Sequence, residues 1–386
     1  MRTDSSRILE GIRILDLTRN IAGPVATMLA AEMGADVIKI EPPGGDEMRR
    51  WPPFVEGESV YFVSCNRGKR SIVLDLKAEA ERATLLKLMA DADVVVENYR
   101  PGTLEKLGLG WENLKASHPK LVWVSVTGYG RDGPRAGAPA YDSMIQAFAG
   151  IMHITGEAGR GPVRSGGSPI DIATAYLAWG SIISGVHSVA KTGRGVLLEV
   201  SLMESALGFI HAYLQAALVG KTIPGRLGSE TMGLYPMGAF MTEDGAYCLV
   251  QVSNEIQWKK LCAVLGVEAL VDDPRFATNP DRVTNRDALR PLLQERLLSR
   301  PAADWEEALI AAGVPASQVC DMDAVATNDQ VVARGMVKEA EIAGGHAIRT
   351  WGVPVRVDGL KPSGAGAVPG LDEHRDEILA GRSWRT

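Results

Sequence analysis

The sequence has few cysteines, and none of them stands in a metal-binding pattern. Its four cysteines are far apart in the 386 residues, at Cys65, Cys248, Cys262 and Cys320. There is no C-x-x-C pair, and no histidine stands at the spacing that zinc sites use. We therefore expect reduced thiols in the core, no disulfide framework and no metal centre.

Blocks of one charge sign and long apolar runs are also lacking. Lys and Arg number 41 against 47 Asp and Glu, and no basic stretch alternates with aromatic residues, which disfavours binding to nucleic acid. No uninterrupted apolar run approaches the roughly 20 residues of a membrane helix, and the first residues lack the apolar core of a secretory signal. We expect a cytoplasmic protein without nucleic-acid or membrane partners.

Three glycine-containing fingerprints are missing as well. The segment after the first predicted strand contains only Gly23, whereas a dinucleotide site needs G-x-G-x-x-G for close approach of the pyrophosphate. Neither the phosphate-binding G-x-x-x-x-G-K-[ST] nor the G-x-S-x-G of serine hydrolases occurs. These absences disfavour nicotinamide and flavin enzymes, nucleotide triphosphatases and serine hydrolases.

What is present is a regular alternation of apolar runs and amphipathic patterns. The predicted strands are Ile12–Leu17, Val37–Ile40, Ile72–Leu76, Val94–Val96 and Leu121–Val126. Helical patterns lie between them, for example at Ala78–Ala90, so the N-terminal part is α/β with a doubly wound, mostly parallel sheet. Ligands of such sheets bind at the carboxyl ends of the strands.

The rest of the chain predicts a second, smaller domain. Long helices are expected from Ile172 and over Met203–Val219, followed by a glycine- and proline-rich linker at 220–236. A hairpin and several helices then predict an α+β domain, and strands are expected at Ile342–Ala347 and Pro354–Val357. The predicted domains are a large domain at 1–220, a small α+β domain at 221–327 and a returning segment at 328–386.

Asp171 is the leading candidate for a catalytic residue. It stands between the glycine-containing Arg164–Ile170 and a long helical pattern, where a carboxylate is held in fixed geometry near backbone N–H groups. From position alone, a helix N-cap is the more common role of an aspartate. In either role, the helix N-terminus is expected to keep the carboxyl ionised.

Two basic segments are candidates for holding phosphates. Asn66–Ser71 precedes one strand, and Glu97–Gly102 follows another, with Lys106 one turn into the next helix. Arg, Lys and an aromatic in such loops suit phosphates and a purine ring, although each charge taken singly is also typical of a solvated surface.

Several ordered segments together resemble family III CoA-transferases, which include the 2-methylacyl-CoA racemases. The matching segments are 9–18, 22–24, 34–46, 66–71, 96–102, 141–147, 313–315 and 373–379. The resemblance implies a Rossmann-like large domain made from the N-terminal half and the C-terminal tail, a small domain, and a homodimer of two interlocked chains. It also implies that Asp171 is the nucleophile, and that coenzyme A or acyl-CoA is a substrate, with no permanently bound cofactor.

The resemblance further assigns residues to the substrates. CoA contacts are implied at Asn20, Leu74, Lys77, Asn98, Tyr99 and Lys106, and an acyl pocket at Tyr61 and Tyr141. Ile21 stands where members that use formate and oxalate carry glutamine, which indicates a different and larger acceptor. Arg164 and Arg226 are candidates to pair with the second charge of a dicarboxylate such as succinate, itaconate or malate.

The implied activity is CoA transfer from an acyl-CoA to a free acid, through an aspartyl anhydride and an aspartyl-CoA thioester. The alternative is a racemase, which in this family uses a histidine where Tyr141 stands. Tyrosine is a poor base at neutral pH, and we regard His153 as a weaker substitute. A catalytically silent acyl-CoA binder is the third possibility. Backbone N–H groups around Asp171, or in Gly225–Gly233, are candidates for the oxyanion hole.

Overall fold

The computed structural model describes residues 6–223, 225–362, 366–380 and 384. The chain divides into two compact units. The large unit comprises residues 1–149, 166–214 and 328–386, and the small unit comprises 150–165 and 215–327. The sequence placed 150–165 and 215–220 in the large domain, whereas in the structure both segments belong to the small unit.

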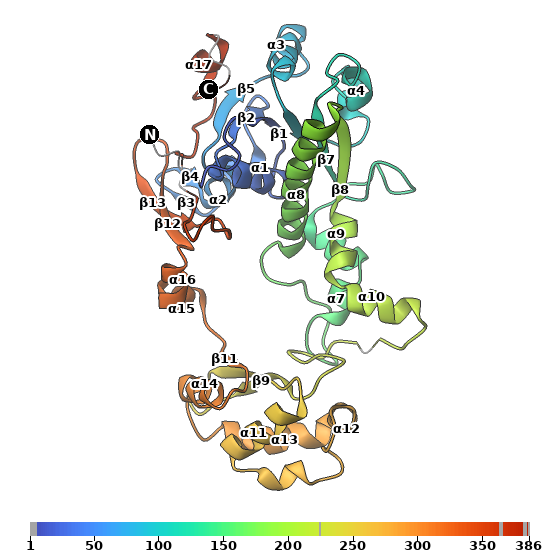
Figure 1. Ribbon diagram of the computed structural model, residues 1–386, viewed down its shortest axis with the longest axis vertical. Coiled ribbons are helices and arrows are strands. Elements are labelled where there is room, and N and C mark those ends of the chain that lie inside the picture. The colour runs from blue at the N-terminus through green and yellow to red at the C-terminus, as the bar shows by residue number, and fades with distance from the viewer. Residues whose placement is uncertain (1–5, 224, 363–365, 381–383, 385–386) are drawn as a thin grey trace. The chain divides into compact units, whose positions relative to one another are not determined.

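The large unit is built on a six-stranded parallel sheet with the strand order β5-β2-β1-β6-β7-β8 (Figure 1). The strands are β1 (Arg13–Leu17), β2 (Asp36–Glu41), β5 (Arg70–Val73), β6 (Val94–Glu97), β7 (Val122–Thr127) and β8 (Val196–Ser201). The strand order reverses between β1 and β6, as in dinucleotide-binding Rossmann folds. The predicted α/β class with a parallel sheet is therefore confirmed.

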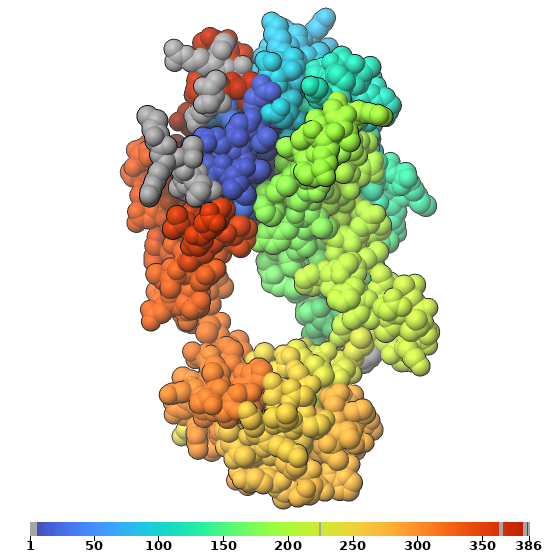
Figure 2. Space-filling view, in the orientation of Figure 1, coloured from blue at the N-terminus to red at the C-terminus, as the bar shows by residue number. Residues whose placement is uncertain are grey.

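Apolar residues on both faces of the strands cause helices to cover both faces. Leu15 and Ile38 belong to one core cluster with Leu85 of α3 (Glu79–Ala90), so α3 covers that face. Side chains alternate along a strand, and Val122 points to the opposite face, where α8 (Pro169–Thr192) packs. Helix α1 (Ala22–Glu32) lies alongside α8 (Figure 2).

The other elements of the large unit are short. They are η1 (Glu47–Arg50), β3 (Phe54–Val55), β4 (Glu58–Ser59), α2 (Val60–Asn66), α4 (Thr103–Lys106), α5 (Trp111–Leu114), α6 (Asp142–Phe148), α9 (Leu202–Phe209), α16 (Asp329–Ala333), β12 (Val337–Glu341), β13 (Ala347–Trp351) and α17 (Arg375–Leu379). Helix α10 (His211–Leu218) crosses into the small unit.

Helix α8 is long and apolar enough, by length and composition, to cross a membrane. In the structure it contacts α1, β7 and β8, and Gly185 allows the close approach to β7. A Cβ atom at Gly185 would lie 2.4 Å from Val122 Cγ1. One face of α8 therefore packs on the sheet of the large unit, while Tyr176 and Leu177 on it are exposed.

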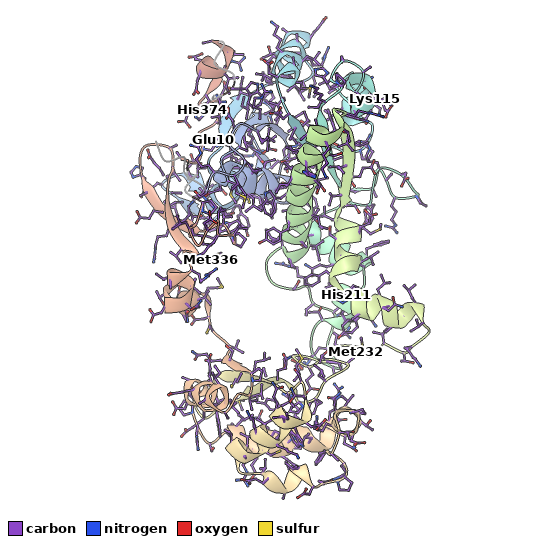
Figure 3. All side chains as sticks on the ribbon, in the orientation of Figure 1. Glu10, Lys115, His211, Met232, Met336 and His374 are labelled. Carbon is purple, nitrogen blue, oxygen red and sulfur yellow. The ribbon has the colours of Figure 1, made fainter. Side chains whose placement is uncertain are left out.

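The C-terminal segment packs on the edge strand β5. The Ser71 carbonyl accepts the His374 N–H, and the Val73 N–H donates to the Asp372 carboxylate at 2.7 Å. His374 is labelled in Figure 3 on this segment. The β12–β13 hairpin is tied to the large unit by Lys338, whose ammonium lies 2.7 Å from the Glu32 carboxylate at the end of α1.

The small unit combines a three-stranded antiparallel sheet with helices. Its elements are α7 (Ile151–Ile154), β9 (Met237–Met241), β10 (Tyr247–Gln251), α11 (Glu255–Leu265), η2 (Glu268–Val271), α12 (Asn279–Thr284), α13 (Arg286–Leu297), α14 (Ala302–Ala311), β11 (Ala316–Gln318) and α15 (Met322–Thr327). Side chains occupy the outer edge of β9: Gln294 pairs with both backbone groups of Met241, and Ser229 accepts the Ala239 N–H. This protects the edge from pairing with another strand.

Two sequence predictions differ from the structure. The helix predicted over Met203–Val219 is two helices, because the backbone at Ile210 leaves helical geometry between α9 and α10. The strand predicted at Ile342–Ala347 is the turn of the β12–β13 hairpin, and Pro354–Val357 forms only an isolated bridge at Val357. Strand β12 contains three charged residues among five, which hid it from a prediction based on apolar runs, and the apolar Ile342 drew the predicted strand into the turn.

Two glycines of α8 give a matched test of this packing. We expect Gly185→Ala to destabilise the protein by about 1–3 kcal/mol, because the new methyl overlaps Val122. Gly180→Ala meets no atom within 4 Å, and should be neutral or stabilising by up to about 1 kcal/mol. Chemical denaturation of both variants measures the difference, and equal effects would contradict the close α8–β7 approach.

Candidate active site

The predicted CoA-binding residues lie in loops at the carboxyl edge of the sheet. Asn98 follows β6 and links its loop to the loop after β1: its Oδ1 accepts the Arg19 N–H at 3.0 Å, and its Nδ2 donates to the Arg19 carbonyl at 2.7 Å. The Arg19 guanidinium lies 5.3 Å from the centre of the Tyr99 ring. The two loops are therefore joined where the strand order reverses, which is where open α/β sheets bind ligands.

Asn20 has two unusual features in the loop after β1. Its backbone adopts a positive φ of 64°, and its N–H donates to the Asp46 carboxylate at 3.4 Å. Its side-chain Oδ1 is buried and has no hydrogen-bond partner among the described residues. Buried acceptors are normally paired, so this atom is suited to accept a hydrogen bond from a ligand.

The remaining predicted CoA contacts differ in accessibility. Lys77 and Lys106 are exposed, in the segments after β5 and β6, and neither ammonium has an ion-pair partner in the described part of the chain. They are free to meet phosphates. The Leu74 side chain is buried in the core under the sheet, so only its backbone is available to a ligand.

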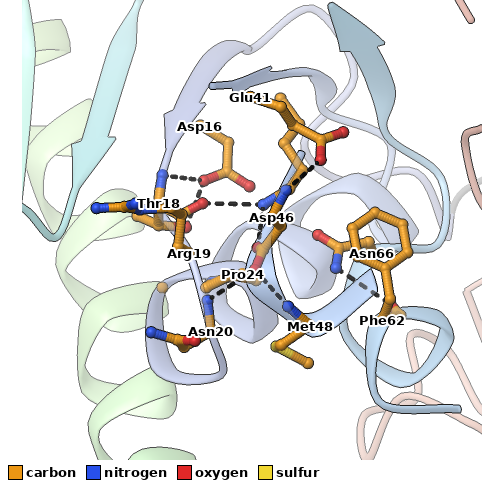
Figure 4. A network of polar contacts seen from close by, with 12 residues as sticks. Asp16, Thr18, Arg19, Asn20, Pro24, Glu41, Asp46, Met48, Phe62 and Asn66 are labelled. Atoms are coloured by element: carbon orange, nitrogen blue, oxygen red, sulfur yellow. Dashed lines mark hydrogen bonds and ion pairs between the residues drawn. The ribbon is translucent and has the colours of Figure 1, made fainter. Parts of the chain in front are cut away.

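A buried network of charges fixes these loops (Figure 4). The ammonium of Lys69 donates to the Asp16 carboxylate, the Pro24 carbonyl and Asn66 Oδ1, each at 2.8 Å. Lys39 on β2 donates to the Thr18 carbonyl at 2.9 Å and to Asp46 at 3.0 Å. The loop after β1 is thus held by Lys69, by Lys39 and, at Asn20 itself, by Asp46.

The charges of this network stabilise one another. Burial disfavours ionisation of Asp16, but Lys69 and Lys39 outweigh it and lower the pKa of its carboxyl. Burial lowers the pKa of Lys69 to about 8 even with Asp16 beside it. Glu41 has a pKa lowered to about 2, because Arg49 and Lys39 outweigh its burial. Removal of one member would leave an uncompensated buried charge.

The segment Asn66–Ser71 was predicted to hold phosphates, and the structure corrects this. Arg67 is buried and lies 3.0 Å from Glu32, and Lys69 lies 2.8 Å from Asp16. Arg70 is also buried, and lies 2.6 Å from Asp36. These basic side chains therefore form ion pairs with carboxylates of the protein and do not bind phosphate.

Asp171 lies in the first turn of α8, and Ser168 is the N-cap of that helix. The cap interpretation of Asp171 is therefore wrong. The capping is done by Asp142, at the start of α6, whose Oδ2 accepts the N–H groups of Ile170 at 2.8 Å and Asp171 at 3.1 Å. The carboxyl of Asp171 has no hydrogen-bond or ion-pair partner within the described part of the chain. Because Gly185 contacts the amino end of β7, the opposite end of α8, with Asp171, lies toward the carboxyl ends of the strands.

Burial and the neighbouring Asp142 charge raise the pKa of Asp171 to about 7. The sequence suggested that the helix terminus keeps Asp171 ionised, and the structure corrects this. The N–H groups that would stabilise its charge donate to Asp142 instead. At pH 7 about half of the molecules therefore carry an ionised Asp171. Those N–H groups are also unavailable for an oxyanion hole.

The two predicted pocket tyrosines lie on different helices. Tyr141 is the N-cap of α6, directly before Asp142, and is 50% exposed, so it is accessible beside the carboxylate pair. Tyr61 on α2 is 43% exposed and packs edge-on against Trp51, with ring centres 5.8 Å apart. The described residues contain no cluster of three side chains that would hold a metal.

The large unit thus combines a Rossmann-like strand order with a partly buried aspartate whose pKa is raised. Residues 9–375 match the model of CoA-transferase family III. The chain belongs to CoA-transferase family III and is a CoA-transferase.

Characterised relatives transfer CoA between acids. The chain is 38% identical to succinyl-CoA:glutarate CoA-transferase of Mus musculus, covering 97% of this chain and 86% of the relative. It is 38% identical to acetyl-CoA:oxalate CoA-transferase of Acetobacter aceti, covering 94% and 93%. Succinyl-CoA:mesaconate CoA-transferase of Haloarcula hispanica is 35% identical, covering 96% and 95%.

Solved structures agree with the fold. A CaiB/BaiF family protein from Brucella suis superposes with a TM-score of 0.85 at 37% identity, covering 97% of this chain and 98% of that one. A protein from Mycobacterium tuberculosis superposes with a TM-score of 0.86 at 29% identity, covering 96% and 98%.

The raised pKa of Asp171 predicts how stability depends on pH. The pKa of Asp171 is about 7 in the folded protein and about 3.9 in the unfolded chain. Its contribution to the free energy of unfolding is therefore complete below pH 4 and is lost as pH rises through 7. Asp171→Asn should therefore raise the unfolding temperature relative to the parent at pH 8, and much less at pH 5. Thermal unfolding at both pH values measures this.

Asp142→Asn is the companion variant. It keeps an oxygen to cap α8 but removes the charge that raises the pKa of Asp171. In the Asp142→Asn variant, Asp171→Asn should raise the unfolding temperature at pH 8 by less than it does in the parent protein. An Asp171→Asn effect that is the same at pH 5 and pH 8 would contradict the assignment.

Proposed function

We propose that the enzyme transfers CoA from an acyl-CoA to a free dicarboxylic acid, with Asp171 carrying first the acyl group and then CoA. The observation that carries this proposal is the uncommitted carboxyl of Asp171, buried enough to have a pKa near 7, at the ligand-binding edge of the sheet. A more basic carboxylate is a stronger nucleophile toward a thioester.

The proposed reaction proceeds through activated acyl groups of similar energy. The Asp171 carboxylate attacks the thioester carbonyl, the C–S bond breaks, and CoA thiolate leaves an aspartyl anhydride. The thiolate then attacks the aspartyl carbonyl, which releases the donor acid and forms the aspartyl-CoA thioester. The acceptor carboxylate attacks this thioester, and the freed thiolate takes the acceptor acyl group from the second anhydride, which regenerates Asp171.

The accessible polar groups at the sheet edge support CoA binding. The exposed ammonium groups of Lys77 and Lys106 suit phosphates, and the buried Oδ1 of Asn20 suits a hydrogen-bond donor of the ligand. In this proposal the exposed Tyr141, which directly precedes Asp142, contacts the acyl group.

The names of the relatives support a dicarboxylic acid as acceptor, because glutarate, oxalate and mesaconate are all dicarboxylates. The donor would be a short acyl-CoA such as succinyl-CoA or acetyl-CoA, as in those enzymes. An assay with these donors and acids, with acetate and propionate as monocarboxylate controls, tests this. Equal rates with monocarboxylates would reject the dicarboxylate preference.

The covalent role of Asp171 is tested by trapping. With an acyl-CoA and hydroxylamine, the parent enzyme should acquire a hydroxamate on the peptide that contains Asp171, detected by mass spectrometry. Asp171→Asn should form none and should lose at least about a thousandfold in transfer rate. Asp91→Asn, an exposed residue at the end of α3, should keep the parent rate. Transfer by Asp171→Asn at the parent rate would refute the mechanism.

We further propose that the enzyme is a homodimer of interlocked chains. Large apolar side chains on the helices of one chain are exposed, which is typical of surfaces that a partner covers. They include Tyr176 (41% exposed), Leu177 (53%), Phe209 (59%) and Leu218 (71%).

Light scattering tests the dimer. We expect a particle of two chains, and interlocked chains should not exchange between tagged and untagged dimers without unfolding. A particle of 41.3 kDa, the mass of one chain, would contradict the proposal.

A further inference from the structure

Arg131 is a charged residue at the ligand-binding edge for which the proposed reaction has no use. It follows β7, and its guanidinium meets carboxylates from three different elements. It lies 2.6 Å from Glu105 of α4, 3.2 Å from Glu199 of β8 and 3.8 Å from Glu97 at the end of β6. The Arg131 side chain is only 19% exposed.

Two of these partners are joined to predicted CoA contacts. Glu105 directly precedes Lys106 in α4, and the Glu97 carboxylate accepts the Tyr99 N–H at 2.9 Å. Helix α4 has only four residues, so its own hydrogen bonds do not hold it in place. Arg131 therefore holds both ends of the segment that carries Tyr99 and Lys106.

The charges of this cluster are unbalanced without Arg131. Three carboxylates face one guanidinium, and Glu97 is buried, which raises the pKa of its carboxyl. Arg131 outweighs the partial burial of Glu105 and lowers the pKa of that carboxyl. Without the guanidinium, Glu105 and Glu199 would repel each other, and α4 would be held to the sheet only by the apolar packing of Leu104.

We propose that Arg131 is a positioning residue for the CoA site, which acts by holding the 97–106 segment so that Tyr99 and Lys106 meet the acyl-CoA. The inference rests on the proposed function, and it assigns Arg131 an effect on acyl-CoA binding and none on the chemistry at Asp171. A purely structural ion pair would affect stability without this selectivity.

Arg131→Met tests the proposal, because methionine keeps much of the apolar stem and removes the charge. In steady-state transfer, the KM for the acyl-CoA should rise about tenfold or more, while kcat and the KM for the acceptor acid stay within about twofold. Arg131→Lys keeps the charge but loses the fork that spans several carboxylates, and should restore part of the loss.

Arg13→Met is the matched control. Arg13 lies 3.0 Å from Asp93 in an ion pair of the same sheet, but at the amino ends of β1 and β6, away from the ligand-binding edge. It should leave the KM for the acyl-CoA unchanged. If Arg131→Met does not fold, Glu105→Gln removes the closest partner and should raise the same KM about threefold.

The outcomes separate this inference from the proposed function. An unchanged KM for the acyl-CoA in folded Arg131→Met, or an equal rise in Arg13→Met, would overturn the role of Arg131. If the parent enzyme transfers no CoA, the proposed function fails. The inference is then tested by calorimetric titration with CoA, where Arg131→Met should bind at least about tenfold more weakly.

Discussion

The site depends on how the N-terminal donors of α8 are used. A helix offers only a few free N–H groups at its start, and Asp142 takes those of Ile170 and Asp171. Two consequences follow. The start of α6 is joined to the start of α8, although Asp142 and Asp171 stand 29 positions apart in the chain. The Asp171 carboxyl is buried beside a second carboxylate, and both effects raise its pKa, so it is only weakly acidic.

The ligand-binding edge needs loops that keep their shape without regular hydrogen bonds. The loop around Asn20 is held by the buried ion pairs of Lys69 and Lys39. The loop around Tyr99 is held by the guanidinium of Arg131. Buried ion pairs contribute little net stability, because desolvation offsets their attraction. Their contribution here is geometric: each directional contact allows one arrangement of the backbone, and a positive φ at Asn20 is held within it.

Much of the large unit could be predicted from sequence, since apolar runs such as those of β1 and β7 have few alternatives to a buried parallel strand. The hairpin β12–β13 was missed because β12 is largely charged and β13 is short. At the site, Asp171 was identified, but its surroundings depend on Asp142, 29 positions earlier, and the sequence does not connect these two residues. The ion pairs of Arg67 with Glu32 and of Arg70 with Asp36 could not be predicted either, because the sequence does not show which distant carboxylate a basic residue meets.

The C-terminal cover of β5 has a consequence for synthesis on the ribosome. Val73 and Arg375, which share a hydrogen bond, stand 302 positions apart in the chain. At usual translation rates this interval lasts roughly 15 to 60 s, during which the sheet can form but its edge strand has no cover. During this interval the nascent chain displays an open β edge, which Asp372 and Arg375 close when they emerge. A chain interrupted within the interval would keep its sheet edge open to pairing with another strand.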